Sequence, residues 1–171
     1  MAACWGNSYK IEGLAEGFGE GDTLLLSDVY LSAKPFDTVI VSEGKFHYRG
    51  VVDSARLQRI YVMGCPDVQA LFFAEPGKTV SICLNADGTS KVGGTEANDA
   101  WQQLTDMCNT YEQQVEALVS SFYQDEISEQ EMTAVTDRIK KLDQQKAEWL
   151  DSFAEYNKDN ATGTFLRKSI R

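Results

Sequence analysis

The sequence predicts an α+β protein in which an antiparallel β-sandwich or barrel-like domain is followed by an antiparallel helical hairpin. Up to about residue 94, apolar residues come in short β-branched or aromatic runs separated by Gly, Asp and Pro. After residue 94 there is no proline, Gly163 is the only glycine, and apolar residues recur three and four positions apart. We therefore divide the chain into a β domain at 5–94, a helical hairpin packed on it at 95–160, and a C-terminal segment at 161–171. This last segment starts either another short helix or a linker.

The β domain is predicted to contain short strands with turn signals between them. The strands are expected near 9–13, 24–31, 36–41, 45–52, 57–63, 70–74, 79–84 and 91–93. The clearest hairpin joins 37–41 to 45–50, because Gly44 can adopt positive φ in the turn between them. The second strand of this hairpin alternates, which predicts one buried and one solvated face: Phe46 and Tyr48 against Lys45, His47 and Arg49.

Two helices are predicted after the β domain. The first carries an unbroken apolar seam: Trp101, Leu104, Cys108, Tyr111, Val115, Leu118 and Phe122. The second places a similar set on one face: Met132, Val135, Ile139, Leu142, Trp149, Phe153 and Tyr156. Asn98 is a candidate N-cap of the first helix, and Ser128 with Glu131 has the capping-box pattern of the second. Because stripes this long are costly to leave in water, we expect them to bury against each other and against the sheet.

Composition and charge exclude several classes of protein. The chain has 171 residues and a net charge of −10, with acidic residues spread along it and no basic patch. An acidic surface repels phosphate backbones, so we expect no nucleic-acid partner. No apolar run approaches the roughly 18–20 residues that span a bilayer. We therefore expect contact with a membrane only through a lipid anchor.

Side chains that could carry chemistry are few and scattered along the sequence. His47, the only histidine, is expected on the solvated face of its strand, where it can form neither a triad nor a multi-histidine metal site. No G-x-S-x-G, H-E-x-x-H or Walker A pattern is present. Asn85, Asp87, Thr89 and Glu96 have EF-hand spacing, but Ser90 stands where the loop needs glycine, and strands flank it. We predict no catalytic, metal-binding or cofactor-binding residue.

The four cysteines lie far apart in the sequence, which excludes a C-x-x-C pair. Cys83 and Cys108 are expected to be small buried hydrophobes. Cys65 precedes Pro66 in a predicted turn, and its greater exposure makes it the candidate reactive thiol.

Cys4 follows Met1-Ala2-Ala3, which is similar to the end of a bacterial lipoprotein signal. In such signals, signal peptidase cuts the chain directly before a cysteine that carries lipid. The basic and apolar parts of the signal are missing, as in a chain that starts just before the processing site. Cys4 is therefore the lipidation candidate, and lipid there would hold the domain outside the cytoplasmic membrane. The alternative is a chance feature of the N-terminus.

The order of several strand and turn motifs resembles a bacterial domain of unknown function. The motifs are residues 9–13 (YKIEG), 28–31 (DVYL), the predicted hairpin at 37–50, 71–77 (LFFAEPG) and 92–98 (VGGTEAN). That domain commonly lies at the N-terminus of lipid-anchored or periplasmic thioredoxin-like, peroxiredoxin-type oxidoreductases of gut-type Gram-negative anaerobes. The resemblance covers about residues 9–160.

The resemblance implies an exported protein of the cell envelope, in the periplasm or at the outer membrane. It also implies a thioredoxin domain further along the chain. The sequence departs from the pattern here, because it ends at Arg171 with no thioredoxin core and no C-x-x-C. No redox residue of the family can therefore be assigned to this sequence. The sequence fits either a region excised from a longer oxidoreductase or a stand-alone relative of the domain.

Three functional hypotheses follow. We favour a non-catalytic accessory or binding domain of an envelope lipoprotein, whose partner is a fused or separate thioredoxin-like domain or a second copy in a homodimer. The alternatives are a participant in thiol–disulfide exchange that uses Cys65, and a small-ligand-binding lipoprotein with an apolar pocket.

Overall fold

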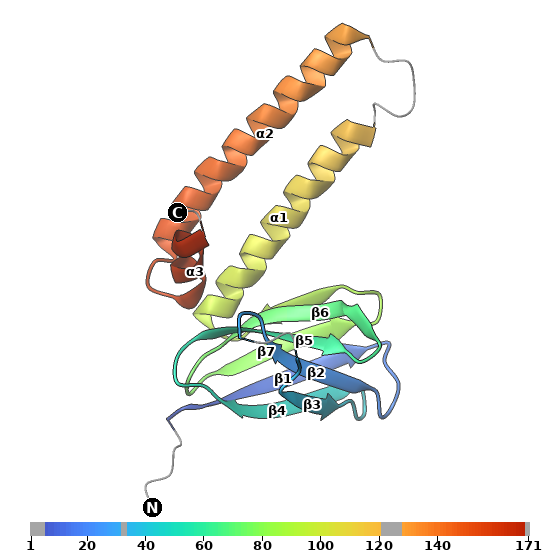
Figure 1. Ribbon diagram of the computed structural model, residues 1–171, viewed down its shortest axis with the longest axis vertical. Coiled ribbons are helices and arrows are strands. Elements are labelled where there is room, and N and C mark those ends of the chain that lie inside the picture. Colours follow the sequence, from blue (N-terminus) through green and yellow to red (C-terminus); the bar gives the residue numbers. More distant parts are fainter. Residues whose placement is uncertain (1–5, 32–33, 121–127, 170–171) are drawn as a thin grey trace, which may run out of the picture. The chain divides into compact units, whose positions relative to one another are not determined.

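The computed structural model describes residues 6–31, 34–120 and 128–169, which form two four-stranded sheets and three helices (Figure 1). The chain divides into a β unit, Met1–Gln102 with Asn160–Thr162, and a helical unit, Gln103–Asp159 with Gly163–Arg171. The elements are β1 (Ser8–Glu16), β2 (Thr23–Asp28), β3 (Asp37–Ile40), β4 (Lys45–Val51), β5 (Arg56–Val62), β6 (Cys65–Ala74), β7 (Thr79–Asn85), β8 (Ser90–Gly93), α1 (Glu96–Ser120), α2 (Glu129–Tyr156) and α3 (Ala161–Ser169).

The two sheets confirm the predicted α+β class and exclude a closed barrel. The strand order is β4-β1-β7-β8 in the first sheet, called sheet A, and β3-β2-β5-β6 in the second, called sheet B. All paired strands are antiparallel except β1 and β7, which run parallel. Each of the eight strands that the sequence predicts is present, although β6 begins at Cys65 and not near Ala70.

The core lies between the sheets and follows the alternation of each strand. In β1, for example, Tyr9, Ile11 and Ala15 are buried, and the residues between them, apart from Gly13, are exposed. Gly13 pairs with Phe46 across β1 and β4, and a Cβ at Gly13 would lie 2.2 Å from the Phe46 ring. The glycine therefore leaves the space that the ring occupies.

The predicted hairpin between β3 and β4 is wrong, although its turn forms. Glu43 and Gly44 have φ of 53° and 68°, and Ser42 and Lys45 exchange two backbone hydrogen bonds of 2.9 and 3.0 Å. Beyond this turn the strands separate, because β3 pairs with β2 in sheet B and β4 pairs with β1 in sheet A. Each strand thereby places an apolar side chain, Val39 or Phe46, in the core. The predicted alternation of β4 is confirmed.

The first turns of α1 contact the free edges of both sheets. Asn98 is 0% exposed, and its side-chain amide accepts a hydrogen bond from Phe73 N (2.8 Å) and donates one to Phe73 O (2.9 Å), at the edge of β6. Gln102 Oε1 accepts a hydrogen bond from Val92 N at the edge of β8 (2.7 Å). Asn98 is therefore not the N-cap; the Thr95 hydroxyl accepts the hydrogen bond from Asn98 N (3.1 Å).

The apolar seams of α1 and α2 are only partly buried. The faces are as predicted, but in α2 only Phe153 and Ala154 are fully buried, and Met132 and Tyr156 are exposed at 53% and 89%. Met132 lies in the first turn of α2 and Tyr156 is its last residue, so both lie at ends of the helix. Within the helical unit, Lys146 lies 4.3 Å from the centre of the Tyr111 ring, and the Tyr111 hydroxyl donates to Asp143.

The capping box at Ser128 and Glu131 is confirmed. Phe122 and the expected connection near 124–127 lie outside the described residues. The C-terminal segment forms the short helix that was one of its two expected structures, α3, and the Thr162 hydroxyl donates to Ala97 O (2.7 Å). In the described part of the chain, no helix combines the length and the apolar character needed to cross a bilayer.

Candidate functional site

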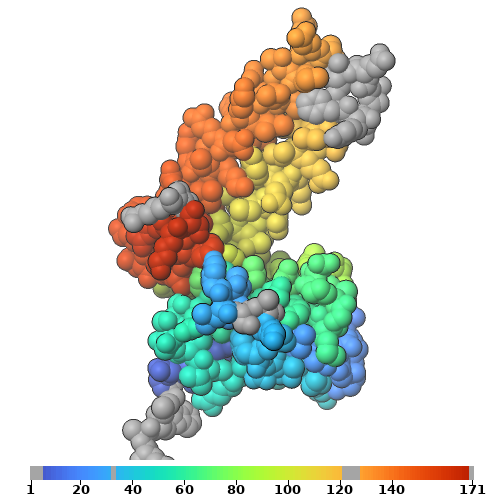
Figure 2. All heavy atoms as spheres, viewed as in Figure 1, coloured from blue at the N-terminus to red at the C-terminus, as the bar shows by residue number. Residues whose placement is uncertain are grey.

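Two recesses on the β unit share Asp28 and Leu31. We call them the outer-face pocket, with a volume of about 520 Å³, and the mouth pocket, with a volume of about 550 Å³. Both are open to solvent. Figure 2 shows the segment after β2, in light blue, at the surface of the β unit.

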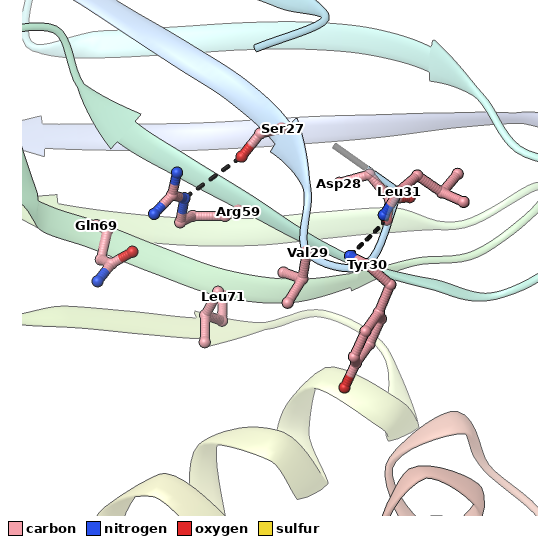
Figure 3. A pocket seen from close by; sticks show the side chains of 8 residues that line it. All are labelled: Ser27, Asp28, Val29, Tyr30, Leu31, Arg59, Gln69 and Leu71. Carbon is pink, nitrogen blue, oxygen red and sulfur yellow. Dashed lines mark hydrogen bonds between the residues drawn. The ribbon is translucent and has the colours of Figure 1, made fainter. Parts of the chain in front are cut away.

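The outer-face pocket lies on the face of sheet B that points away from the core. Its lining consists of Ser27, Asp28, Val29, Tyr30, Leu31, Arg59, Gln69 and Leu71 (Figure 3). Arg59 is held in place, because its Nε donates to Ser27 Oγ (3.3 Å) and its guanidinium lies 4.2 Å from the centre of the Tyr61 ring. The pocket therefore contains a fixed cationic group together with the apolar side chains of Val29, Leu31 and Leu71.

An ordered apolar tip lies beside this pocket. We use this name for Val29, Tyr30 and Leu31, which are exposed at 41%, 69% and 69%. Asp28 Oδ1 accepts hydrogen bonds from Tyr30 N (2.9 Å) and Leu31 N (3.0 Å), so the carboxylate holds the turn that presents the tip (Figure 3). Three consecutive large apolar residues in water are unfavourable for a free surface and typical of a contact surface.

The mouth pocket lies at one end of the sandwich, where β2 and β4 end and β3 and β5 begin. It is lined by Asp28, Leu31, Lys34, Pro35, Phe36, Val51, Val52, Asp53, Arg56 and Gln58. Val52 and Gln58 are its buried members, exposed at 4% and 5%, and they form its floor. Phe36 and Val51, exposed at 49% and 71%, form apolar walls.

A polar bridge between the two sheets lies at the floor of the mouth pocket. The Tyr9 hydroxyl, from sheet A, donates to Gln58 Oε1, from sheet B, at 2.5 Å. Burial, together with the nearby Tyr48, raises the pKa of Tyr9 well above its ordinary value. Tyr48 donates to Asp37 Oδ2 (3.1 Å), and burial followed by this bond raises the pKa of Tyr48 to about 12. Both phenols are therefore neutral hydrogen-bonding groups at neutral pH.

The rim of the mouth pocket carries paired charges. Arg56 lies 3.1 Å from Asp53 Oδ1 and 3.9 Å from Asp28 Oδ2. The hydrogen bond from Arg56 lowers the pKa of Asp53 below its ordinary value. Lys34 adds a second cation to the rim. Two cations thus stand beside two anions, and the rim has no net charge.

The residues singled out by their chemistry and described by the structure lie on different elements. His47 lies on the solvated face of β4, as predicted, with its Nδ1 2.6 Å from Glu12 Oε2 on β1. Cys65 is exposed, but it begins β6 and does not lie in a turn. Cys83 and Cys108 are half-buried and not fully buried as expected, and burial raises the pKa of the Cys83 thiol. Cys4 lies outside the described residues.

The EF-hand-like spacing belongs to a hydrogen-bonded turn between β7 and β8. Asp87 Oδ1 accepts from Thr89 N (2.8 Å) and Thr89 Oγ1 (2.6 Å), and Asn85 Nδ2 donates to Thr89 Oγ1 (2.8 Å). These contacts occupy three of the four side chains that the spacing would assign to calcium, and the fourth, Glu96, is the first residue of α1. Among the described residues, no group of three or more His, Cys, Asp or Glu side chains is arranged to hold a metal ion.

Sequence reasoning did not single out Gln58 or Tyr9. The available signal was a polar residue at a core position of a strand, since Gln58 has the same orientation as Ile60 in β5. Alternation identifies such a position only when the phase of the strand is known. The sequence could not supply the partner, because Tyr9 lies 49 residues away and in the other sheet.

The comparisons with known proteins give one family. The model of a family described as Domain of unknown function (DUF4369) matches residues 9–101, which is more than half of the chain. The match covers every strand of the β unit except the first residue of β1, and it ends within the first turns of α1. No curated protein matches the chain.

Proposed function

The chain belongs to the DUF4369 family, and from that premise we propose that it is a non-catalytic accessory domain that binds a partner protein in the bacterial cell envelope. The partner in this proposal is a thioredoxin-like domain, either fused to the chain or separate. The resemblance to domains that precede such oxidoreductases supports this choice of partner.

The apolar tip is the observation that carries the proposal. Tyr30 and Leu31 are each 69% exposed, yet two hydrogen bonds to Asp28 order the backbone beneath them. An exposed apolar group that is held in one conformation loses little entropy when a partner covers it. Tyrosine is also among the residues that are enriched where interfaces gain most of their binding energy.

The experiment is a titration of the ¹⁵N-labelled chain with the thioredoxin-like domain encoded in the same or the adjacent reading frame. We expect chemical-shift changes at residues 28–31. Tyr30→Glu should weaken binding at least tenfold, because a carboxylate would be desolvated at the centre of the contact. Met63→Glu is the matched control, since Met63 is 59% exposed and lies at the other end of sheet B, where its N donates to Thr23 O.

Two outcomes would contradict the proposal. One is the absence of shift changes at the apolar tip at millimolar partner concentration. The other is an equal loss of affinity in Tyr30→Glu and Met63→Glu, which would indicate non-specific hydrophobic association and not binding at a defined surface.

In this proposal α1 and α2 pack together as an antiparallel hairpin. The contacts of Tyr111 on α1 with Asp143 and Lys146 on α2 support that arrangement. Paramagnetic relaxation from a spin label at Gln114→Cys, in a background without the natural cysteines, should broaden α2 resonances near Leu142. Broadening confined to α1 would contradict the hairpin.

The envelope location depends on Cys4. The order Met1-Ala2-Ala3-Cys4 supports lipidation at this cysteine. Expression behind a lipoprotein leader, with metabolic labelling by a radioactive fatty acid, should label the protein, and Cys4→Ser should abolish the label. A label that persists in Cys4→Ser would place the modification elsewhere.

The alternative, thiol–disulfide exchange at Cys65, is tested in the same material. An insulin-reduction assay with dithiothreitol should show no turnover by the chain alone. Turnover that disappears in Cys65→Ser would replace the proposed binding function by an enzymatic one.

A further inference from the structure

We propose that the mouth pocket binds a small neutral molecule with an apolar body and a carbonyl oxygen, and that the Gln58 side-chain amide donates a hydrogen bond to that oxygen. This inference goes beyond the proposed function, because it concerns a ligand in the mouth pocket, whose lining includes Leu31 of the apolar tip but not Tyr30.

The amide of Gln58 has an unused donor. Its Oε1 accepts the hydrogen bond from Tyr9, and this bond turns the NH₂ group away from Tyr9. The described part of the chain supplies no acceptor for Nε2. Among the described residues, Glu75 Oε2 is the side-chain nitrogen or oxygen atom that is closed off from solvent and has no hydrogen-bond partner. Gln58 Nε2 also has no partner among them, and it is therefore an atom that solvent can reach. Since Gln58 lines the mouth pocket and is only 5% exposed, its donor opens onto that pocket.

The walls fit an apolar body. Leu31, Phe36 and Val51 are exposed at 69%, 49% and 71%, and Val52 joins Gln58 at the floor. A volume of about 550 Å³ lies within the range of small-molecule sites. An apolar ligand with one acceptor at its buried end would cover these side chains and satisfy the amide donor in one pose.

The charges at the rim favour a neutral ligand over an ion. Arg56 is already paired with Asp53 and Asp28. Lys34 supplies a second positive charge, so the four charged side chains of the lining sum to zero. A charged ligand would have to separate these pairs or lose water without a new partner. A neutral carbonyl compound avoids both costs.

The test uses acetophenone, with isopropylbenzene as a probe of nearly the same shape that lacks the oxygen. Each is titrated into the ¹⁵N-labelled full chain and followed by ¹H–¹⁵N NMR. We expect acetophenone to shift the Gln58 side-chain amide and the Val52 backbone amide. It should bind about fivefold more tightly than isopropylbenzene, the contribution of one hydrogen bond.

Three variants separate the pocket from effects on folding. Gln58→Leu should abolish the preference for acetophenone. Tyr9→Phe keeps the amide but removes the hydrogen bond that orients it, so it should reduce the preference less than Gln58→Leu does. Val51→Trp, at a position that is 71% exposed, should narrow the pocket and weaken both probes without disturbing the core.

The proposal is overturned by equal affinities of the two probes in the unmodified chain, by shifts outside the mouth pocket, or by unchanged binding in Val51→Trp. Leu31 belongs to both surfaces, but Tyr30 does not line the mouth pocket, so none of these results depends on Tyr30. Failure of this inference is therefore distinguishable from failure of the proposed function, which Tyr30→Glu tests.

Discussion

Position 13 requires glycine, because the ring of Phe46 fills the space that a side chain would occupy. A Cβ there would lie 2.2 Å from the ring of Phe46, which is buried in the core and cannot move freely. We predict that Gly13→Ala lowers the free energy of unfolding by about 1–3 kcal/mol, the usual cost of overpacking. Urea denaturation measures this change in the free energy of unfolding. Gly6→Ala, where a Cβ meets nothing within 4 Å, is the control and should change stability little; equal effects would contradict the packing of this pair.

The thiols should differ in reactivity. Cys65 is exposed, whereas Cys83 is half-buried and burial raises its thiol pKa, which lowers the thiolate fraction near neutral pH. In a Cys4→Ser background, we predict that an aromatic disulfide reagent at pH 8 modifies Cys65 at least tenfold faster than Cys83. Mass spectrometry of timed samples locates the modified residue. Faster labelling of Cys83 would mean that sheet A opens locally around β7, which lies between β1 and β8.

At the scale of elements, Asn98 joins α1 to sheet B by two hydrogen bonds to the backbone of Phe73. We predict that Asn98→Ala destabilises the β unit by about 2–4 kcal/mol, because two buried backbone bonds are lost. The loss is expected even though alanine favours the helix. Gln103→Ala, at an exposed position of α1, is the control for helix propensity and should be neutral or slightly stabilising. Similar unfolding midpoints for the two variants would rule out the role assigned to Asn98.

The elements that the sequence predicts well are those decided by local pattern. The strands of the β unit follow from short apolar runs and turn residues, and the helix seams follow from the spacing of residues such as Leu104 and Phe153. The pairing of strands is harder to predict from the sequence. The turn at Glu43 and Gly44 forms as predicted, yet its strands join different sheets, because burial of Val39 and Phe46 between the sheets outweighs local hairpin pairing.

The mouth pocket illustrates why sites are harder to predict than elements. Its floor combines Val52, which follows β4, with Gln58 of β5, and its walls come from Phe36, which precedes β3, and Val51 at the end of β4. Nothing in the local pattern of these segments indicates that they meet. Only the topology of the two sheets brings them to one end of the sandwich.

For the whole molecule, the buried phenols set a response to alkaline pH. The folded pKa of Tyr48 is about 12 and that of Tyr9 is also raised, whereas an unfolded tyrosine titrates near 10. Between these values the folded state binds more protons than the unfolded state, so stability is intact below pH 10 and falls as the pH rises towards 12.

We therefore predict that the urea midpoint decreases from pH 9 to pH 11, and that Tyr48→Phe makes the decrease smaller. The ultraviolet absorbance of tyrosinate at these two pH values gives an independent titration. The lysines are common to both proteins, so the difference between them isolates Tyr48. An equal decrease in both would assign the response to other groups.

The parallel pairing of β1 with β7 has a consequence for how the protein acquires its structure. Lys10 aligns with Thr79 and Glu16 with Asn85, so the first strand waits for a neighbour that is made about seventy residues later. Contacts this distant in sequence are slow to form. During synthesis, Ile11 must remain without its β7 partner, Val80, until β7 emerges. A nascent chain that stops before Thr79 should accordingly be protease-sensitive along its whole length and dependent on a holding chaperone.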